Sequence, residues 1–260
     1  MNLVEAALLG LVQGLTEFLP VSSSGHLVIG EMLLGHIQDG ILFEIIVHVG
    51  SLVAILVYYR RRLAELVVGV LSGDADALRY SGKIVLATLP VVIVGLALKE
   101  SIEAMFASAW VPGVGLLATS AILLTTRQSI DARGPEPTWL QALCIGGAQV
   151  LAIVPGISRS GTTVAAAMAL GVSPMAATEF SFLMAVAAIS GAAVLAAPDA
   201  QLASPEVVRA CLIGGAVAGA SGIAALWLFV RLLRLRRFHH FAYYTFAVGS
   251  LFLLWVAVTD

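Results

Sequence analysis

The sequence predicts an all-α polytopic membrane protein with about six transmembrane helices and two re-entrant helical hairpins. The first observation behind this fold class is composition, since 60% of the 260 residues are hydrophobic and only 12% are charged. A mean hydropathy of +0.99 excludes an ordinary soluble domain. The other two observations are the spacing of the apolar stretches and an internal repeat. This length fits one membrane domain, residues 1–260, with no separate soluble domain.

The first apolar stretch, Asn2 to Leu19, is a poor full span. Glu17 and several glycines and polar residues interrupt it, and it stops at Pro20. A polar turn follows, and then a short apolar segment from Leu27 to about Leu34. Two half-length helices joined by a polar turn predict a re-entrant hairpin, which a membrane tolerates where it lines a cavity. A single ordinary span ending in a loop is the alternative.

Three full spans are predicted after this hairpin, followed by a second hairpin and three more spans. Each span has about 20 residues or slightly fewer, which suffices to cross the hydrocarbon core. A polar loop around residues 73–76 separates the first two. The predicted spans run from about Ile41 to Tyr59, Ile84 to Leu98, Val111 to Thr125, Pro174 to Ala196, Val207 to Leu233 and Phe241 to Val258.

The second hairpin, Thr138 to Leu170, contains the most informative turn of the chain. Its segment Pro155-Gly156-Ile157-Ser158-Arg159-Ser160-Gly161-Thr162-Thr163 places a permanent charge among hydroxyls and glycines, between apolar segments. An Arg at mid-membrane costs about 2.5–3.5 kcal/mol on insertion scales, so Arg159 is expected to face a cavity and an anion. Gly156 permits a tight turn, and Ser158 is a good helix N-cap. The alternative is an Arg that extends to the membrane surface from a helix end.

The two hairpins belong to an internal repeat, residues about 1–126 and about 138–260. Because three spans, an odd number, separate the hairpins, the second copy lies upside down relative to the first. The site of such an inverted-topology repeat is expected at the midplane, where the two broken segments meet. Chance similarity among small residues is the alternative. The matching positions are Gln13 with Gln149 and 21–25 with 157–161, at an offset of 136, and Glu44 with Glu179, at an offset of 135.

The basic residues are unequally distributed between the two sides of this topology. Eleven of the fourteen lie on one side, two on the other, and Arg159 lies within the membrane. By the positive-inside rule the first side is cytoplasmic, so both termini and the active site are expected outside, with Asp39, Glu100, Glu103, Asp199 and Glu206. The run Leu3 to Val12 has no basic leader, so no cleavable signal is expected. The eleven are Arg60, Arg61, Arg62, Arg79, Lys83, Arg127, Arg133, Arg231, Arg234, Arg236 and Arg237.

Convergence of the two hairpins would bring a set of hydroxyls to one cavity with Arg159. Two helix N-termini would then face one anion, each adding roughly half a positive charge. His26 lies one helical turn after Ser22 and Ser23 and is expected to provide the base that a neutral Ser nucleophile needs. Each hydroxyl alone is weak evidence, because Ser and Thr in membrane helices usually bond their own backbone. The set is Ser22, Ser23, Ser24, Ser158, Ser160, Thr162 and Thr163.

Three carboxylates lie inside apolar segments, where each must be neutral, paired or bound to a metal. Glu17 is expected to hold a divalent cation against a diphosphate. Glu44 and Glu179 are repeat-related and are expected to accept backbone N–H bonds at the hairpin turns. His48, one turn after Glu44, is expected to be its hydrogen-bond partner. The glycine pairs expected to allow close helix packing are Gly10 with Gly14 and Gly215 with Gly219.

Two long motifs carry a family resemblance. They are Gln13-Gly14-Leu15-Thr16-Glu17-Phe18-Leu19-Pro20-Val21-Ser22-Ser23-Ser24-Gly25-His26 and the turn from Pro155 to Thr163. The chain resembles, over nearly its whole length, the undecaprenyl-diphosphate phosphatases of the bacitracin-resistance type. The resemblance implies a multi-pass enzyme of the bacterial inner membrane that removes the terminal phosphate of undecaprenyl diphosphate. Such an enzyme recycles the lipid carrier of peptidoglycan synthesis, with consequences for cell wall biogenesis, cell shape and antibiotic resistance.

The resemblance also implies roles for particular residues. Ser23, His26, Arg159 and Glu17 are the expected catalytic residues, and Glu17 with Gln13 would bind a divalent cation, Mg²⁺ or Ca²⁺. Ser23 would attack the terminal phosphorus or position a water, and His26 would handle the proton. Gln13 departs from the family pattern, since many members have a second Glu there, and His48 stands where an amide is expected. The expected substrate-binding residues are Ser22, Ser24, Gly156, Ser158, Ser160, Thr162 and Thr163.

A lipid or anion transporter is the rival from another class, since inverted repeats with broken helices are a transporter design. The reactive set of Ser23, His26 and Glu17 favours the enzyme, because a carrier can dispense with it. A structural scaffold would not need an intramembrane Arg. The expected partners are a polyprenyl diphosphate lipid and the bilayer, and no nucleic acid. The sequence leaves open whether the protein forms a homodimer or also translocates lipid.

Overall fold

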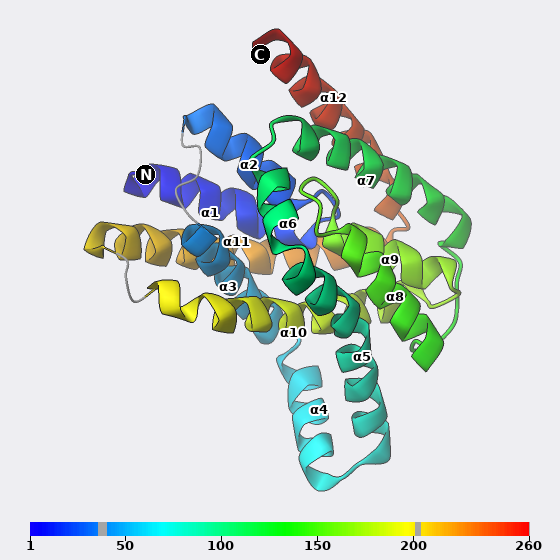
Figure 1. Cartoon of the computed structure of the whole chain (residues 1–260). Helices are drawn as coiled ribbons and strands as arrows, with labels where there is room; N and C mark the ends of the chain where they lie inside the picture. Colours follow the sequence, from blue (N-terminus) through cyan, green and yellow to red (C-terminus); the bar gives the residue numbers. More distant parts are fainter. Residues whose placement is uncertain (36–40, 201–203, 260) are drawn as a thin grey trace.

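The computed structural model describes residues 1–35, 41–200 and 204–259, and these residues are almost entirely helical (Figure 1). Within these ranges the only β-type pairing is an isolated bridge between Gly134 and Val172. The elements are α1 (Leu3–Phe18), α2 (Ser23–Leu34), α3 (Ile41–Tyr58), α4 (Arg60–Ser72), α5 (Ala75–Ala97), α6 (Lys99–Phe106), α7 (Trp110–Ser129), α8 (Trp139–Leu151), α9 (Arg159–Ala169), α10 (Pro174–Ala200), α11 (Pro205–Arg234), the 3-10 helix η1 (Phe238–His240) and α12 (Phe241–Thr259).

Four segments of the described chain are long and apolar enough to cross a membrane, and the number rises to six if each of two bent helix pairs forms one span. The four are single stretches, formed by α5, α10, α11 and the residues of η1 with α12. In the bent pairs, α3 and α4 are bent by 80° and α6 and α7 by 96°. The predicted fold class, an all-α membrane protein with six spans and two further helix pairs, is confirmed.

The pairs α1–α2 and α8–α9 are the two predicted hairpins. The longest of the four helices, α1, has 16 residues. At 1.5 Å per residue it spans roughly 24 Å, less than the roughly 30 Å of the hydrocarbon core. The helices of each pair pack against each other, and the two turns touch. A Cβ added to Gly25 would lie 2.8 Å from Gly156 Cα. In addition, Ser160 Oγ donates a hydrogen bond to the carbonyl of Leu19 at 3.3 Å.

The repeat is visible in how the helices pack. The first helix of each hairpin packs against the middle span of the other half, α1 on α11 and α8 on α5. A Cβ added to Gly10 would lie 2.3 Å from the Gly214 carbonyl oxygen, and one added to Gly146 would lie 2.3 Å from the Ala87 carbonyl oxygen. Gly10 and Gly146 are separated by 136 positions, the predicted repeat offset. The close packing predicted at Gly14, Gly215 and Gly219 is also confirmed, against Ala218 and Gly50.

The structure adds two short helices to the predicted elements. Helix α4 begins where the sequence analysis ends a span, at Arg60, and it continues at an angle because its apolar face packs on α5. It ends at Gly73, whose φ of 76° is in the left-handed region that glycine adopts readily. Helix α5 therefore begins at Ala75 and not at Ile84, with Asp74 as its N-cap. Helix α6 lies between α5 and α7, beyond the predicted end of the second span.

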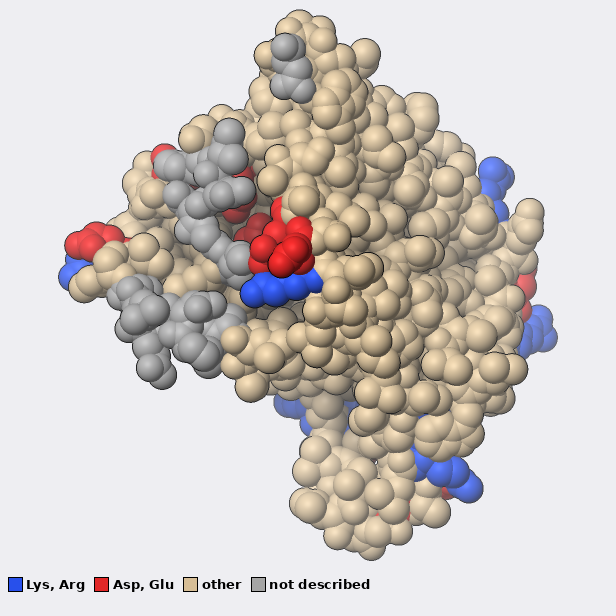
Figure 2. Space-filling model, in the orientation of Figure 1, with Lys and Arg blue, Asp and Glu red and all other residues tan. Residues whose placement is uncertain are grey.

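Charged side chains are sparse on the face shown in Figure 2. One mixed acidic and basic group lies beside the position of α6, and basic side chains gather near α4 and the start of α5, which project from the bundle (Figures 1 and 2). The rest of this face is mainly uncharged, as expected of a surface in contact with lipid. Of the acidic residues predicted to lie outside, Asp39 and the side chain of Asp199 lie outside the described residues.

Candidate active site

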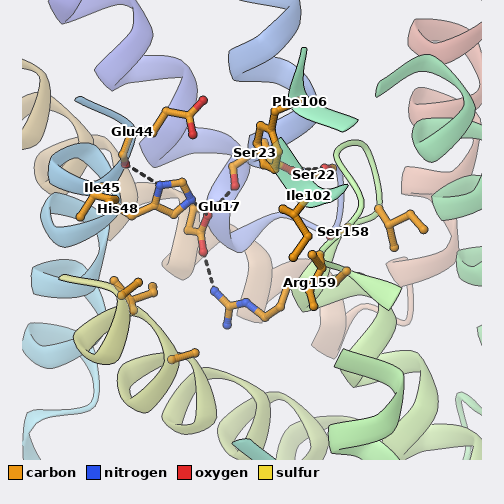
Figure 3. Close-up of a pocket in the computed structure, with 17 residues that line it drawn as sticks. Glu17, Ser22, Ser23, Glu44, Ile45, His48, Ile102, Phe106, Ser158 and Arg159 are labelled. Atoms are coloured by element: carbon orange, nitrogen blue, oxygen red, sulfur yellow. Dashed lines mark hydrogen bonds and ion pairs between the residues drawn. The ribbon is translucent and has the colours of Figure 1, made fainter. Parts of the chain in front are cut away.

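The carboxylate of Glu17 is the centre of a polar cluster between the two hairpins (Figure 3). Glu17 lies in the last turn of α1, and its side chain is only 6% exposed. Its Oε1 accepts a hydrogen bond from the guanidinium of Arg159 at 2.5 Å, and its Oε2 accepts one from Ser23 Oγ at 2.5 Å. The two hairpins thus bring a guanidinium and a hydroxyl to opposite oxygens of one carboxylate.

Local helix capping places these two groups. Ser22 and Ser158 are the N-caps of α2 and α9, and their Oγ atoms accept from the N–H groups of Gly25 and Gly161 at 3.3 and 3.1 Å. Ser23 and Arg159 therefore occupy the first helical positions, and both line the same cavity. Ser22 has a φ of 68°, a region that a non-glycine residue seldom adopts and that is typical of functional turns.

A cavity of about 350 Å³ adjoins this cluster. Its polar lining comes from both hairpins and from α3, and its apolar lining comes mainly from α6, α10 and the second hairpin. Such a cavity suits an anionic group attached to an apolar chain. The polar lining residues are Glu17, Ser22, Ser23, Ser24, Glu44, His48, Ser158 and Arg159, and the apolar ones are Ile45, Ile102, Phe106, Ala152, Ile153, Ile157, Ala188, Ile189 and Ala192.

Four residues expected to bind substrate lie outside the lining of this cavity: Gly156, Ser160, Thr162 and Thr163. Thr163 Oγ1 bonds to the Arg159 carbonyl at 2.7 Å, and Ser160 Oγ bonds across to the first hairpin. Thr162 Oγ1 is buried and has no hydrogen-bond partner among the described residues. The bonds of Ser160 and Thr163 hold the second turn in shape.

Two further hydroxyls hold the second turn, and the sequence analysis missed both. Thr119 Oγ1 in α7 donates to the carbonyl of Gly156 at 2.7 Å and accepts from the N–H of Ser158 at 2.9 Å. Ser181 Oγ in α10 lies 2.6 Å from Thr163 Oγ1, and its carbonyl accepts from Arg159 at 3.5 Å. No local pattern marks these residues, since each contacts a turn that is distant in sequence.

The predicted pairing of Gln13 and Glu17 as metal ligands does not match the arrangement of their side chains. Gln13 Nε2 donates to Glu17 Oε2 at 3.0 Å and to Ser51 Oγ at 3.2 Å. The amide presents its NH₂ group because an amide oxygen facing a carboxylate would be repelled. Gln13 Oε1 therefore points away from Glu17, and it has no partner in the described part of the chain. No group of three His, Cys, Asp or Glu side chains among the described residues is placed to hold a metal.

The hydrogen bonds of His26 and Ser23 go to other partners, so the predicted Ser–His pair is not formed. His26 Nδ1 lies 2.8 Å from the carbonyl oxygen of Ser22, and its Nε2 lies 2.9 Å from Tyr244 Oη. A carbonyl oxygen only accepts, so Nδ1 carries the proton and the Nε2 lone pair accepts from the tyrosine. The ring also stacks on Tyr244, with centroids 5.7 Å apart. The imidazole is thus turned toward α12, although the spacing of Ser23 and His26 places both residues on the same face of the helix.

The imidazole in the cavity belongs to His48. Its Nδ1 donates to the main-chain carbonyl of Glu44 at 2.6 Å and not to the carboxylate for which it was the predicted partner, and its Nε2 lies 3.5 Å from Glu17 Oε2. The sequence analysis did not predict that His48 lies near Glu17. The available signal was the presence of a His inside an apolar helix, one turn after Glu44. The expectation for Glu179 is wrong, because its carboxylate bonds to Arg62 at 2.9 Å and to Tyr80 at 3.4 Å and not to backbone N–H groups.

The fold and the site together define a class of protein: an integral membrane protein with a cavity between two broken hairpins that is lined by hydroxyls, carboxylates and an arginine. Comparison with known families shows which family within this class the chain belongs to. The sequence model of the family described as bacitracin resistance protein BacA matches residues 6–251. The chain belongs to this family.

Curated relatives match the chain over nearly its full length. An undecaprenyl-diphosphatase of Desulfatibacillum aliphaticivorans is 38% identical over 270 residues, covering 96% of this chain and 97% of the relative. The undecaprenyl-diphosphatase of Desulfosudis oleivorans is 36% identical, covering 99% of this chain and 100% of the relative. That of Geobacter metallireducens is 37% identical, covering 98% and 99%. The family resemblance drawn from the two motifs is confirmed.

Proposed function

We propose that the chain is an integral membrane undecaprenyl-diphosphatase, a phosphoanhydride hydrolase that converts undecaprenyl diphosphate to undecaprenyl phosphate and phosphate. Its relatives carry this name, and they match the chain over nearly their whole length. The observation that carries the proposal is the contact of Ser23 and Arg159 with the same Glu17 carboxylate. The product would be the recycled lipid carrier of peptidoglycan synthesis, which accounts for a role in cell wall biogenesis and for resistance to bacitracin.

Substrate binding in this proposal relies on Arg159 and on the N-termini of α2 and α9. A guanidinium binds two phosphate oxygens at once, and a helix N-terminus contributes roughly half a positive charge. Because Glu17 is bonded to Arg159 at 2.5 Å before substrate arrives, the diphosphate competes with that carboxylate for the guanidinium. The apolar walls from α6 and α10 are placed to contact the first part of the prenyl chain.

In the proposed chemical step, Glu17 and not His26 accepts the proton of the Ser23 hydroxyl. Ser23 Oγ already donates to Glu17 Oε2 at 2.5 Å, so the carboxylate is positioned to take the proton as the oxygen attacks the terminal phosphorus. The new bond joins Ser23 Oγ to phosphorus, and the bond that breaks is the one to the bridging oxygen, which leaves with undecaprenyl phosphate. Water then hydrolyses the phosphoserine. In the one-step variant, Ser23 and Glu17 instead orient a water that attacks directly.

A divalent cation, Mg²⁺ or Ca²⁺, remains part of the proposal, but with different ligands. These ions prefer oxygen ligands and are often held by one or two carboxylates together with substrate phosphates. Among the described residues, Glu44 is the second carboxylate that lines the cavity, and both oxygens of Glu17 already accept hydrogen bonds. Glu44 is therefore the residue that would hold the cation. When bound, the cation would screen the charge of the diphosphate.

The proposed orientation places the cavity and both termini on the extracytoplasmic side of the bacterial inner membrane. Its support is the distribution of basic residues, eleven of fourteen of which fall on one side of the six-span topology. Glu44 begins α3 near the cavity, whereas Arg60, Arg61 and Arg62 follow the end of the same helix. The basic side is therefore the one remote from the cavity, which supports an active site that faces away from the cytoplasm.

Phosphate release from undecaprenyl diphosphate by the purified protein tests the function. We expect release that stops on addition of a chelator and that is about 10²–10⁴-fold slower in Ser23→Ala. A folded protein that binds the lipid but releases no phosphate would contradict the proposal and favour a transporter. Acid-stable phosphoserine at Ser23, or solvent oxygen incorporated in one step, distinguishes the covalent route from direct attack by water.

A further inference from the structure

A second set of charged and aromatic side chains lies at the far end of α3 from the cavity. Arg60 and Arg61 begin α4 directly after α3, and Arg231 and Arg234 lie in the last turn of α11, which packs on α3. All four arginines are exposed. None has an acidic group within 4.0 Å in the part of the chain that the structure describes. Neighbouring Arg62 differs, because it is paired with Glu179 at 2.9 Å.

These arginines border two adjoining hollows. One, of about 430 Å³, is lined by 58–62, and the other, of about 390 Å³, is lined by Tyr58, Trp227 and Val230 together with Arg231, Arg234 and Leu235. Tyr58 lines both, so the hollows share a wall. The guanidinium of Arg231 lies 5.3 Å from the centre of the Trp227 ring. Two pairs of cations therefore flank a surface of aromatic and aliphatic side chains.

This surface, which we call the basic–aromatic patch (residues 58–61, 227, 230, 231, 234 and 235), is separate from the candidate active site. Tyr58 follows Glu44 by fourteen positions on α3, a distance of about 21 Å along the helix axis. Tyr and Trp side chains are enriched at the headgroup level of membranes, where one end is apolar and the other is wet. The patch therefore has the composition expected at the depth of lipid headgroups.

We infer that the basic–aromatic patch binds the phosphate headgroup of an anionic phospholipid. Guanidinium groups match phosphate geometry with two parallel hydrogen bonds, and no acidic side chain of the described residues lies within 4.0 Å of these four to compete with the lipid. Free phosphate offers the same kind of anionic oxygen but lacks acyl chains. Trp227 and Leu235, which are 57% and 55% exposed, would contact acyl chains. These exposed apolar walls favour a lipid over a free anion, and a bound lipid would join α11 to the bend between α3 and α4.

Lipid titration of the purified, delipidated protein tests this inference, with binding followed by native mass spectrometry and by the thermal midpoint. The probes are phosphatidylglycerol, phosphatidylcholine and inorganic phosphate. We expect phosphatidylglycerol to bind and to raise the thermal midpoint. The double variant Arg231→Gln/Arg234→Gln should bind this lipid at least about tenfold more weakly. The matched control Arg133→Gln/Arg209→Gln removes two exposed arginines elsewhere and is expected to bind like the parent protein.

Three outcomes would overturn the inference. The first is equal binding of phosphatidylglycerol by the patch variant and the control. The second is equal stabilisation by phosphatidylcholine, which would mean that charge is irrelevant. The third is full stabilisation by inorganic phosphate alone, which would indicate a site for a free anion. If Arg231→Gln/Arg234→Gln does not fold, Arg60→Gln/Arg61→Gln tests the other border of the same patch. Phosphate release from the prenyl diphosphate serves as the check on folding, since the patch lies outside the catalytic cavity.

Discussion

Ser23 and Arg159 are separated by more than half the chain, yet each lies 2.5 Å from one oxygen of the same Glu17 carboxylate. This relationship links the two hairpins chemically. It also explains how an arginine is tolerated at membrane depth, since its charge is paired and its side chain is only 17% exposed.

Replacement of Arg159 tests its role in substrate binding and turnover. We expect Arg159→Ala and Arg159→Lys each to lower phosphate release by about 10³-fold or more, because an Arg on a transferring phosphoryl group contributes about that much. Lysine retains the charge but not the two-pronged geometry. The measurement is phosphate release from undecaprenyl diphosphate, with the elution profile in detergent as the folding control. Wild-type-like turnover by Arg159→Lys would show that a point charge suffices.

Glu17 and Ser23 are expected to act as one unit. Glu17→Gln removes the proton acceptor and Ser23→Ala removes the proton donor, so each alone should lower turnover by about 10²–10⁴-fold. The double variant should be hardly slower than either single variant, as found when residues act together. The measurement is a double-mutant cycle on the rate of phosphate release. Multiplicative losses would mean that the two residues contribute independently, which would remove Glu17 as the base for Ser23.

His26 is expected to position the Ser22 turn and not to transfer the proton. In His26→Asn the amide N–H is placed to replace Nδ1 as donor to the Ser22 carbonyl, and in Tyr244→Phe only the contact to Nε2 is lost. Both variants should keep turnover within about tenfold of the parent, equivalent to about 1.4 kcal/mol. The comparison is with Ser23→Ala in the same phosphate-release assay. A loss of turnover in His26→Asn as large as that in Ser23→Ala would indicate that His26 transfers the proton.

Glu44→Gln tests the proposed cation ligand. The substitution preserves size but removes the negative charge, so the concentration of Mg²⁺ or Ca²⁺ needed for half-maximal activity should rise by about tenfold or more. Saturating cation should restore part of the activity. Glu179→Gln is the matched control, because Glu179 is the repeat-related carboxylate but is bonded to Arg62 away from the cavity. An unchanged cation response in Glu44→Gln would exclude Glu44 as a ligand.

Helix packing between the repeats is tested by two neighbouring glycines of α8. A Cβ at Gly146 would lie 2.3 Å from the Ala87 carbonyl oxygen, whereas one at Gly147 would meet nothing within 4 Å. Gly146→Ala should therefore destabilise the protein by about 1–3 kcal/mol through overpacking. Gly147→Ala should leave stability unchanged or raise it by up to about 1 kcal/mol, since alanine favours helix. The readout is the thermal midpoint in detergent, and equal midpoints would contradict the packing of α8 on α5.

Much of the fold follows from the sequence because the relevant signals are local. Apolar stretches of sufficient length, the breaks at Pro20 and Gly156, and the repeat offset of 136 positions gave the spans, the hairpins and their relation. The bends were not predictable in this way. Arg60 to Arg62 mark the end of an apolar stretch whether the helix stops or continues as α4, and only packing on α5 decides between these.

In the site, too, local features were predictable from the sequence and contacts between distant residues were not. The sequence predicted a helix start at Arg159, because its N-cap Ser158 is a local feature, whereas it placed the apolar segment of the first hairpin from Leu27 and α2 begins at Ser23. The direction of a side chain at such a start depends on distant partners. Tyr244 turns His26 away from Ser23 from a position 218 residues away, and Thr119 holds the Ser158 turn from a separate helix. Spacing alone could not distinguish the His26 ring from the His48 ring as the imidazole in the cavity.

A disulfide between the two hairpin turns tests the meeting of the hairpins most directly. The Cβ that would be added to Gly161 lies 3.3 Å from Pro20 Cβ, close to the roughly 3.5–4.5 Å that joins the Cβ atoms of a disulfide. In a background where Cys144 and Cys211 are replaced by Ala, Pro20→Cys/Gly161→Cys should crosslink on oxidation in the membrane, and Pro20→Cys/Gly147→Cys should not. Absence of the first crosslink, or equal crosslinking of both pairs, would show that the turns do not meet and that the proposed catalytic cavity does not form.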